Sequence, residues 1–341
     1  MKRALVTGIT GQTGSYLTEI LLGQNYSVDG LVRRLSTPNM KNIQHLLSNP
    51  NLKLIPGDVE DATRISGIIK DGQYDTVYNF AGMSLVSYSF DNPVQTALTN
   101  YIGVLNIVEA IKHHSSHTKI YQASTSELFG GISNLPNTEY TPFVPRSPYA
   151  VSKLASYWTI VNARLGYGIF ACNGLLHNHE SRRRGIEFVT QKVVTSAAKY
   201  SQSLEWGTQY DILQVGNLEA KRDWGHALDY ARGANLIMEH DKPDDYVLAT
   251  GEAHSVRELI ELAYGMAGVS IRWVGTGRNE MGFDKEDGRA IVEVSPEFYR
   301  PTEVNILIGD PSKAEQVLGW KREYNFVSLI KDMYRAAIDN L

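Results

Sequence analysis

The first half of the chain alternates short apolar runs with amphipathic stretches. The runs are rich in β-branched and aromatic residues and are apolar on both faces, as buried parallel strands are. Strand and helix in strict alternation, joined by right-handed crossovers, give a doubly wound parallel sheet. The pattern therefore predicts an α/β fold of Rossmann type, with strands within 4–8, 27–34, 52–58, 75–82 and 119–125 and helices within 16–24, 40–48, 62–72 and 93–114.

The second half becomes irregular after about residue 175, where tryptophans, prolines and charged loops interrupt the alternation. This change predicts a first domain at 1–175 and a smaller lobe, mainly 176–341, that is interleaved with it. Segments near 213–250 and 305–310 are expected to return to the first domain. Because no flexible linker separates the two parts, we expect them to share an interface and a cleft in which a ligand binds.

Composition narrows the class of ligand. The chain has 37 acidic and 33 basic residues and a formal net charge of −4, with basic residues scattered apart from a short run at 181–185. This distribution is not the electrostatic footprint of a nucleic-acid-binding protein. A small or nucleotide-sized ligand is expected instead.

Cysteine usage and hydropathy narrow the cellular setting. The single cysteine, Cys172, excludes an internal disulfide and a cysteine-based metal cluster, and we expect no metal site. No apolar run approaches the roughly 18 residues that span a bilayer, and the first residues, "MKRALVTG", lead straight into a strand pattern. We expect a soluble, cytoplasmic protein that is not bound to a membrane.

A glycine-rich stretch, "TGITGQTG", follows the first predicted strand and precedes a helix pattern. It places Gly8, Gly11 and Gly14 three residues apart, and Gln12 and Thr13 lie in the same turn. Such a turn lets the backbone and a helix N-terminus approach the pyrophosphate of a dinucleotide. The alternative is an ordinary strand-to-helix turn, but the position at the first strand of an alternating pattern favours a dinucleotide.

The end of the second strand predicts which dinucleotide binds. An acidic residue there would accept the ribose hydroxyls of NAD, whereas an arginine would bind the additional phosphate of NADP. The chain has Arg33 and Arg34 at this point and no acid, which favours NADP. The alternative is that the two arginines are a solvated pair.

Two further strand ends contribute candidate cofactor contacts. After the third strand, Asp58 either accepts a hydrogen bond from the adenine amino group or caps the following helix, as Asp61 also can, and Val59 lies beside it. After the fourth strand, "NFAG" contributes Phe80 and Ala81, where small residues let the backbone approach a cofactor.

Tyr149 and Lys153 are the first pair that suggests catalysis. Their i, i+4 spacing in "SPYAVSKLASYW" places both side chains on one face of a helix. A phenol is a poor base near neutral pH, but a nearby ammonium favours the phenolate. Next to a nicotinamide, this pair is suited to removing the proton of an alcohol while hydride leaves its carbon.

The stretch "YQASTSELFG", residues 121–130, ends the fifth strand at the edge of the sheet where active sites of open α/β folds lie. Thr125 is expected to hydrogen-bond the substrate oxygen that faces Tyr149. Glu127 lies close enough to reach a neighbouring carbon. Because a simple alcohol dehydrogenase needs no such carboxylate, Glu127 points to an additional chemical step.

Taken together, seven stretches closely resemble GDP-mannose 4,6-dehydratases, which belong to the extended short-chain dehydrogenase/reductase superfamily. They are "TGITGQTGSYL", "YQASTSELFG", "PRSPYAVSK", "NHES", "GNLEAKRDWGHALDY", "ATGEAHSVREL" and "YRPTEVN…GDPSKA". The resemblance covers nearly the whole chain, and it implies an NADP-binding first domain and a nucleotide-sugar-binding smaller lobe. The chain departs from the usual family residues at Thr13, Met83 and Arg182, each of which borders an expected pocket.

The resemblance implies a redox-neutral dehydration of GDP-mannose to GDP-4-keto-6-deoxymannose. Tyr149, aided by Lys153, would take the C4 hydroxyl proton while hydride passes to NADP, and Glu127 would then remove the C5 proton and assist loss of the C6 hydroxyl as water. Hydride would return to C6. The family also implies substrate contacts at Ser84, Asn178, Lys192, Arg222, Arg300 and Glu303, although any one of these charged groups could instead belong to a salt-bridge network between the lobes.

Other readings stay open from the sequence. A 4-reductase or 4-epimerase of nucleotide sugars shares the glycine turn and the Tyr149–Lys153 pair but does not need Glu127. A dehydratase of another GDP-sugar, such as a GDP-manno-heptose, and a non-enzymatic NADP-binding regulator are further alternatives. Family members pair through the helix that carries Tyr149 and the helix before it, and often form tetramers through the loop after strand two, so a homodimer or homotetramer is expected.

Overall fold

The computed structural model describes residues 1–37, 39–130, 136–298 and 304–341. Its main body is a seven-stranded sheet in the order β11-β6-β5-β4-β1-β2-β3, in which every neighbouring pair is parallel. This order confirms the predicted doubly wound, Rossmann-type fold. The strands are β1 (Arg3–Thr7), β2 (Ser27–Val32), β3 (Leu52–Pro56), β4 (Thr76–Asn79), β5 (Lys119–Ala123), β6 (Ala171–Leu176) and β11 (Tyr246–Leu248).

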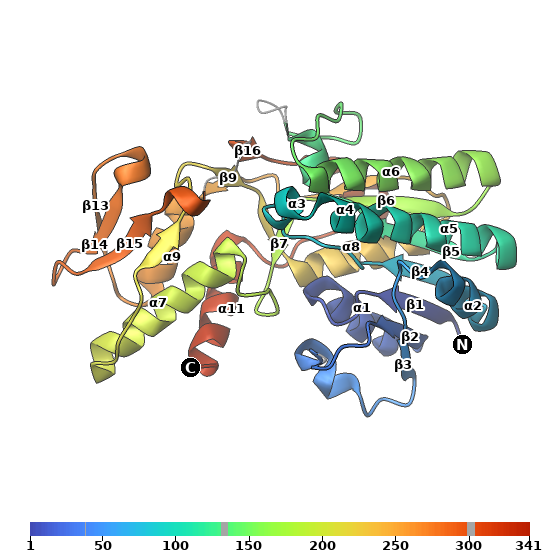
Figure 1. Cartoon of the computed structure of the whole chain (residues 1–341), viewed down its shortest axis with the longest axis horizontal. Helices are drawn as coiled ribbons and strands as arrows, with labels where there is room; N and C mark the ends of the chain where they lie inside the picture. The colour runs from blue at the N-terminus through green and yellow to red at the C-terminus, as the bar shows by residue number, and fades with distance from the viewer. Residues whose placement is uncertain (38, 131–135, 299–303) are drawn as a thin grey trace.

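Helices cover both faces of this sheet (Figure 1). On one face, α2, α5 and α6 pack against Leu5, Val77 and Ile120, and on the other, α1 and α8 pack against Val6, Tyr78 and Tyr121. Successive strand residues point to opposite faces, so runs that are apolar throughout supply both layers of the core. These helices are α1 (Gln12–Gly23), α2 (Ala62–Gly72), α5 (Gly103–His114), α6 (Pro148–Tyr167) and α8 (Ala227–Glu239).

Two predicted helices differ from the expectation. The stretch 40–48 contains only a short 3-10 helix, η1 (Lys41–Leu46), because Ile43 is its one buried residue and little apolar surface holds it against the sheet. The stretch 93–114 is divided into α4 (Pro93–Ala97), a π-helical turn η2 (Leu98–Ile102) and α5. A short helix, α3 (Tyr88–Asp91), precedes them.

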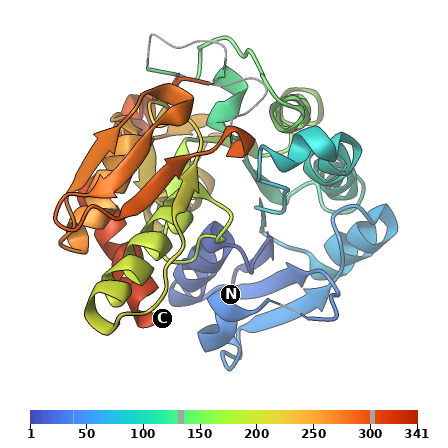
Figure 2. The ribbon, with the colours of Figure 1, turned by 60° about the vertical axis from the view of Figure 1, so that its left-hand side comes forward.

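The smaller lobe is built around a four-stranded sheet in the order β13-β14-β15-β8. Helices α7, α9 and α11 pack together beside it, and their apolar side chains form one buried cluster with those of the sheet. Figure 2 shows this sheet standing beside the helices of its own lobe. The elements are β8 (Leu213–Val215), β13 (Ile271–Val274), β14 (Met281–Asp284), β15 (Ala290–Val294), α7 (Val189–Trp206), α9 (Val256–Met266) and α11 (Phe326–Asp339).

Two small sheets lie where the lobes meet (Figure 1). One pairs β7 with β10, and the other has the order β12-β9-β16. Of the segment near 213–250, β11 joins the main sheet and α8 packs against that sheet, whereas β8 pairs with β15 in the smaller lobe. The remaining elements are β7 (Asn178–Glu180), β9 (Lys221–Arg222), β10 (Trp224–His226), β12 (His254–Ser255), β16 (Ile306–Leu307) and α10 (Ser312–Leu318).

Candidate active site

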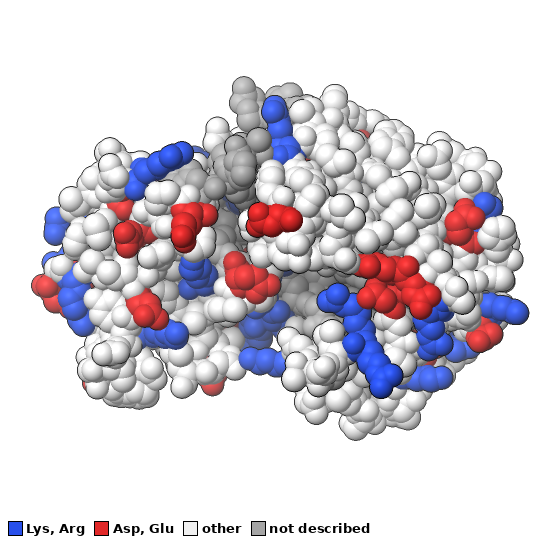
Figure 3. Space-filling model, viewed as in Figure 1, with Lys and Arg blue, Asp and Glu red and all other residues white. Residues whose placement is uncertain are grey.

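A cavity of about 860 Å³ lies between the two lobes and is lined by residues from both. Figure 3 shows the surface of this face hollowed between the lobes. The cavity runs along the carboxyl ends of β1, β4 and β5, which is the edge where open α/β sheets bind their ligands. Its walls bring together most of the predicted site residues, namely Gly8, Gly11, Gln12, Thr13, Gly14, Arg33, Asp58, Val59, Phe80, Ala81, Ser84, Thr125, Glu127, Tyr149, Lys153, Asn178, Lys192 and Arg222.

The glycine turn, which we call the glycine cradle, is packed so closely that a side chain does not fit at Gly8 or Gly14. Gly8 has a φ of +64°, and a Cβ atom there would lie 2.6 Å from the carbonyl carbon of Phe80. A Cβ at Gly14 would lie 2.4 Å from the carbonyl oxygen of Gly8. Gly11 is the N-cap of α1, and no side chain caps the first turn of that helix. Gly11, Gln12, Thr13 and Gly14 line the cavity, so the start of this helix lies at its wall, a position that fits the pyrophosphate of a dinucleotide.

Thr13 and Gln12 connect the glycine turn to β7. The hydroxyl of Thr13 lies 3.0 Å from Nε2 of His179, and Gln12 Nε2 donates to the His179 carbonyl oxygen at 2.7 Å. Nδ1 of His179 lies 2.9 Å from the carbonyl oxygen of His177, so Nδ1 carries the proton and Nε2 accepts from Thr13. Burial lowers the pKa of His179 to about 4. Thr13, one of the three positions that differ from the usual family residues, therefore forms a neutral hydrogen bond with an uncharged histidine.

The two arginines after β2 differ in their position relative to the cavity. Both are exposed, but only Arg33 is among the residues that line the cavity. Of the two aspartates that could cap α2, Asp61 is the N-cap, because it accepts from the backbone N–H of Arg64 at 2.9 Å. Asp58 lines the cavity, and its carboxylate accepts from the backbone N–H of Glu60 at 3.2 Å.

The loop after β4 is held by Asn100 in the π-helical turn η2. The Asn100 side chain accepts from the backbone N–H of Met83 at 2.8 Å and donates to the Met83 carbonyl oxygen at 3.1 Å. Asn100 therefore holds the main chain of Met83 and does not depend on which side chain stands at this position. Ser84, the next residue, is exposed and lines the cavity.

Helix α6 carries Tyr149 and Lys153 into the cavity. Its N-cap, Ser147, accepts from the backbone N–H of Ala150 at 3.1 Å, and Pro148 occupies the first turn, where its missing N–H costs no hydrogen bond. The Thr125 hydroxyl lies near enough to the Tyr149 phenol to lower its pKa. Lys153 donates to the carbonyl oxygen of Ala123 at 2.9 Å. Both side chains therefore lie at the end of β5.

Burial shifts the ionisation of this pair. It raises the pKa of Tyr149 to about 12, and the nearby Thr125 hydroxyl and the charge of Arg184 offset part of the effect. Burial also lowers the pKa of Lys153 to about 8. The shift of Tyr149 is opposite to the one expected from a neighbouring ammonium, because removing the phenolate from water outweighs nearby charges.

Glu127 lies beside this pair and is only 7% exposed. It belongs to the short 3-10 helix η3 (Ser126–Phe129), and its backbone N–H donates to the Thr125 hydroxyl at 3.2 Å. Its charge is one of the causes that raise the pKa of Tyr149. The hydroxyl, phenol, ammonium and carboxylate groups predicted for catalysis thus line one wall of the same cavity.

The predicted substrate contacts occupy the part of the cavity that the smaller lobe contributes. Lys192, on α7, lies with its ammonium 3.6 Å from the ring centroid of Phe298, and burial lowers its pKa. Asn178 begins β7, and Arg222 ends β9 with Nη1 donating to the Lys221 carbonyl oxygen at 2.9 Å. Arg300 and Glu303 lie outside the described residues.

The cavity wall also contains residues to which the sequence analysis assigned no role, among them His179 and Arg184. In the structure Arg184 pairs with Glu180 at 3.0 Å and stacks on Phe188. Arg182, the third departure, does not line the cavity and instead pairs with Asp332 on α11. The run "NHESRRRG" contains these residues, but the spacing of its charges does not show which of them point into the cavity.

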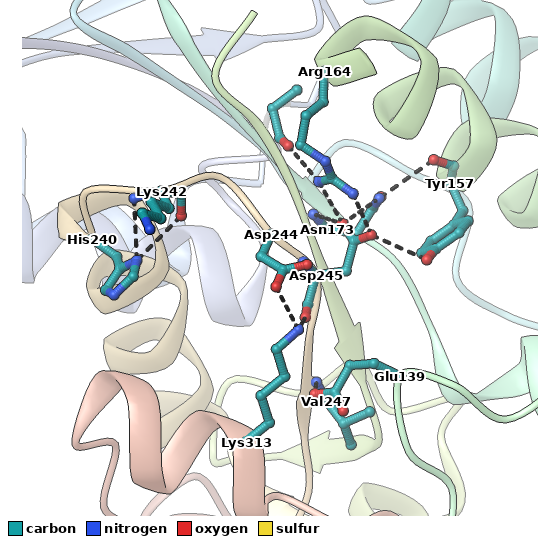
Figure 4. Close-up of polar contacts among 11 residues, drawn as sticks. Glu139, Tyr157, Arg164, Asn173, His240, Lys242, Asp244, Asp245, Val247 and Lys313 are labelled. Atoms are coloured by element: carbon teal, nitrogen blue, oxygen red, sulfur yellow. Dashed lines mark hydrogen bonds and ion pairs between the residues drawn. The ribbon is translucent and has the colours of Figure 1, made fainter.

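Asp245 fixes the far end of α6 to the sheet (Figure 4). Its buried carboxylate accepts from the Tyr157 hydroxyl at 3.1 Å and from Arg164 at 3.0 and 2.7 Å. The backbone and side-chain nitrogens of Asn173, on β6, each donate to it at 3.0 Å. With Ser147 at its start and Asp245 near its end, the helix that carries Tyr149 and Lys153 is anchored at both ends.

The expectations on metal binding and membrane association concern the whole described part of the chain. Among the described residues, no group of three or more histidine, cysteine, aspartate or glutamate side chains is placed to hold a metal ion. Within the same ranges, no helix has the length and apolar character needed to cross a membrane. The expected cytoplasmic location stays a prediction.

The chain is similar in sequence to a known family over nearly its whole length. A family model described as GDP-mannose 4,6 dehydratase matches residues 5–333. Proteins named GDP-mannose 4,6 dehydratase from Cricetulus griseus and Homo sapiens are each 46% identical to this chain, over 99% and 98% of it and over 92% and 91% of their own lengths. A protein with the same name from Sinorhizobium fredii is 45% identical over 100% of this chain and 97% of its own length.

Solved structures with lower identity share the fold. A dTDP-glucose 4,6-dehydratase from Bacillus anthracis in complex with NAD has a TM-score of 0.82 at 19% identity and covers 100% of this chain and 97% of its own. A UDP-glucose 4-epimerase from Thermotoga maritima with UDP-glucose has a TM-score of 0.81 at 21% identity, with coverage of 99% and 98%. At these identities the likeness supports the fold alone.

Proposed function

The chain belongs to the GDP-mannose 4,6-dehydratase family, and from this membership we propose how its residues remove water from GDP-mannose to give GDP-4-keto-6-deoxymannose. The reaction is a hydro-lyase reaction with no net oxidation, in which C4 of the sugar is oxidised only transiently. The observation that carries the assignment of roles is that Tyr149, Thr125 and Glu127 line one cavity, with Thr125 and Glu127 both near enough to Tyr149 to affect its pKa.

The first chemical task is to remove the C4 hydroxyl proton. Thr125 and Tyr149 both line the cavity and lie near each other, so a substrate hydroxyl that enters between them finds both a donor and an acceptor. Tyr149 takes the proton as the general base, and Thr125 orients the C4 oxygen. When bound, the nicotinamide dinucleotide supplies a hydride acceptor, a hydride donor and, in its oxidised form, a positive charge that favours the tyrosine phenolate.

The second task is to eliminate water across C5 and C6. A ketone at C4 makes the C5 hydrogen acidic, so a carboxylate can remove it. Glu127 takes the C5 proton and then gives a proton to the C6 hydroxyl, which leaves as water. The buried position of Glu127 on the same wall as Tyr149 supports this pair of roles. Proton return to C5 and reduction at C6 complete the product.

We assign the cofactor preference to Arg33. The glycine cradle fits a nicotinamide dinucleotide, and Arg33 lines the cavity at the end of β2, where the residue that discriminates between NAD and NADP lies in this type of fold. A guanidinium there can bind the 2′-phosphate of NADP in a bidentate manner. This supports NADP as the cofactor, with Arg33 and not Arg34 making the contact.

Substrate selection is assigned to the smaller lobe. Lys192 and Arg222 supply positive charge for the diphosphate of the GDP-sugar, and Asn178 offers an amide to the sugar or its adjoining phosphate. Burial lowers the pKa of Lys192, and an anion bound beside the ammonium would offset this shift, which supports the role of Lys192. Arg300 and Glu303 keep the roles that the family resemblance implies.

We also propose that the protein is at least a homodimer that pairs through α6 and α5. Val151, Trp158 and Leu165 lie seven residues apart on α6 and are between 51% and 78% exposed. This spacing puts three large apolar side chains in one stripe on the outer face of the helix. A second copy of the same face would cover the stripe.

The experiment that tests the proposed function is incubation of the protein with GDP-mannose and a small amount of NADP⁺. The product is expected to be lighter than the substrate by one water molecule, with no accumulation of NADPH. Stoichiometric NADPH would contradict the redox-neutral reaction, and an isomer of unchanged mass would indicate a 4-epimerase. Parallel kinetics with a GDP-manno-heptose separate the two sugars, with the higher kcat/KM expected for GDP-mannose.

A further inference from the structure

We propose that Gln122, Asn79 and Thr7 are positioning residues that orient Lys153 through an unbroken chain of buried hydrogen bonds across the sheet. The chain begins at the loop after β4, which lines the cavity, and ends at the carbonyl oxygen of Ala123, which holds Lys153. This inference rests on the proposed function of Lys153 as part of the catalytic pair.

The three side chains occupy one level of the sheet. Thr7 on β1 is in register with Asn79 on β4, and Asn79 is in register with Gln122 on β5. Residues in register on neighbouring parallel strands project from the same face. Leu5, Val77 and Ile120, each two residues earlier, pack with α2, α5 and α6, so the polar row lies on the face that α6 covers.

Hydrogen bonds join the row from end to end. The backbone N–H of Ala81 donates to the Thr7 hydroxyl oxygen at 3.1 Å, and the Thr7 hydroxyl donates to Asn79 Oδ1. Asn79 Nδ2 donates to Gln122 Oε1 at 2.7 Å. Gln122 Nε2 then donates to the carbonyl oxygen of Ala123 at 2.9 Å, the same oxygen that accepts from Lys153 Nζ at 2.9 Å.

Every bond in this chain runs in one direction. Because Gln122 Oε1 accepts from Asn79, its amide nitrogen must face Ala123. Because Asn79 Oδ1 accepts from Thr7, its own nitrogen must face Gln122. A rotation of either amide would place two acceptors or two donors against each other. The orientation of the Ala123 carbonyl group on β5 is therefore fixed by side chains on β4 and β1, and bonds aligned in this way polarise one another.

Pairing of the strands does not by itself require the row. Backbone hydrogen bonds already join β1 to β4 and β4 to β5 over four residues each, and apolar side chains would fill the same positions without buried polar atoms. Thr7, Asn79 and Gln122 are all buried, so each would carry a desolvation cost if its partner were lost. Both ends of the row lie at the site.

The cofactor end of the row is packed closely against the glycine turn. Ala81 and Phe80 line the cavity, and the Phe80 carbonyl carbon is the atom that a Cβ at Gly8 would meet at 2.6 Å. A displacement of the glycine turn would therefore move Ala81, and with it the first donor of the row. The row thus ties the position of Lys153 to the wall of the dinucleotide cradle.

The test compares variants of the full chain with GDP-mannose and NADP⁺. Gln122→Met keeps the length of the side chain and removes both ends of its amide. We expect it to lower kcat by about tenfold to a hundredfold, the range for loss of a hydrogen bond that acts on a charged group, with the KM for GDP-mannose within about twofold. Thr7→Val should lower kcat less than Gln122→Met does, because Thr7 lies farther from Lys153. Thr7→Ser keeps the hydroxyl and should have the wild-type kcat.

Two controls separate the outcomes. Asn235→Leu removes another buried amide, which accepts from the Tyr78 hydroxyl at 3.3 Å outside the row. It should lower stability and leave kcat unchanged. Lys153→Met tests the proposed function itself: if this variant turns over normally, the role of Lys153 is wrong. If Lys153→Met is inactive but both Gln122→Met and Thr7→Val keep the wild-type kcat, only the positioning role is overturned. Should Gln122→Met fail to fold, the Thr7→Val and Thr7→Ser pair decides the question.

Discussion

Lys153 donates its hydrogen bond to the carbonyl oxygen of Ala123 at 2.9 Å, so a charged ammonium is held in the interior by a neutral acceptor. Burial is the cause of its lowered pKa of about 8. The protonated lysine is therefore unfavourable to the fold near neutral pH, which is the pattern expected of a residue kept for chemistry rather than for stability.

Replacing this lysine is expected to stabilise the cofactor-free protein. The folded-state pKa of Lys153 lies below the value of about 10.4 for a lysine in water, so the unfolded chain binds the proton more tightly. The cost is complete below about pH 8 and fades as the pH rises toward about 10. Lys153→Met should therefore raise the free energy of unfolding by up to about 3 kcal/mol at pH 7.

Urea unfolding at pH 7 and near pH 10 would measure this effect. The gain of Lys153→Met should shrink at the higher pH, whereas Lys199→Met, at an exposed position on α7, should show no such dependence. A variant that is less stable than the wild type at pH 7 would contradict the assigned cost of burying the ammonium.

Glu127→Gln is expected to separate oxidation from dehydration. The amide cannot remove the C5 proton, whereas Tyr149 and Thr125 are untouched, so C4 oxidation should persist. We expect water loss to fall by about a hundredfold or more, the contribution typical of a general acid–base residue. Rapid-quench mass analysis and cofactor absorbance would follow the two steps, with Glu205→Gln on α7 as an exposed control. Normal dehydration by Glu127→Gln would mean that another group performs the elimination.

The two arginines after β2 provide a matched pair for cofactor preference. Arg33 lines the cavity and Arg34 is not among its lining residues. Arg33→Ala should weaken NADP binding by about tenfold to a hundredfold, as loss of a charge-assisted hydrogen bond does, and leave NAD binding little changed. Arg34→Ala should bind both cofactors as the wild type does. Equal losses for NADP and NAD in Arg33→Ala, measured by calorimetry, would remove Arg33 from the role.

The apolar stripe on α6 predicts the mode of assembly. Trp158→Asp introduces a charge at the centre of the stripe and should convert a dimer or larger assembly into smaller species at micromolar concentration. Leu204→Asp, on α7 in the smaller lobe, replaces a similarly exposed side chain and should leave the assembly intact. Light scattering after size exclusion would report the masses. An unchanged mass for Trp158→Asp would place the interface elsewhere.

Local spacing was enough to predict the parts of the site that depend on neighbours along the chain. The glycine turn and the Tyr149–Lys153 pair are of this kind, because a few intervening residues fix their geometry. The choice between Asp58 and Asp61 as the cap of α2 was local too, but either aspartate satisfies the same pattern. Only the structure shows Asp61 in the bond with Arg64.

Contacts between distant parts of the chain lay beyond such reasoning. Thr13 meets His179 across 166 residues, and Asn79 meets Gln122 across 43. Each depends on strand register and on how β7 crosses the end of α1. Lys153 was expected beside Tyr149, yet its bond partner is a backbone carbonyl group that has no signature in the sequence. Burial also reversed the expected direction of the pKa shift of Tyr149, because spacing carries no measure of desolvation.

The fate of the hydrogen at C4 tests the central claim most directly. If one active site oxidises C4, eliminates water and reduces C6, a deuterium placed at C4 of GDP-mannose must reappear at C6 of the product, while C5 takes its hydrogen from solvent. Proton and deuterium NMR of the product formed with unlabelled NADP⁺ would show this. We predict deuterium at C6 in nearly every product molecule. Deuterium retained at C4 or lost to the solvent would contradict the mechanism.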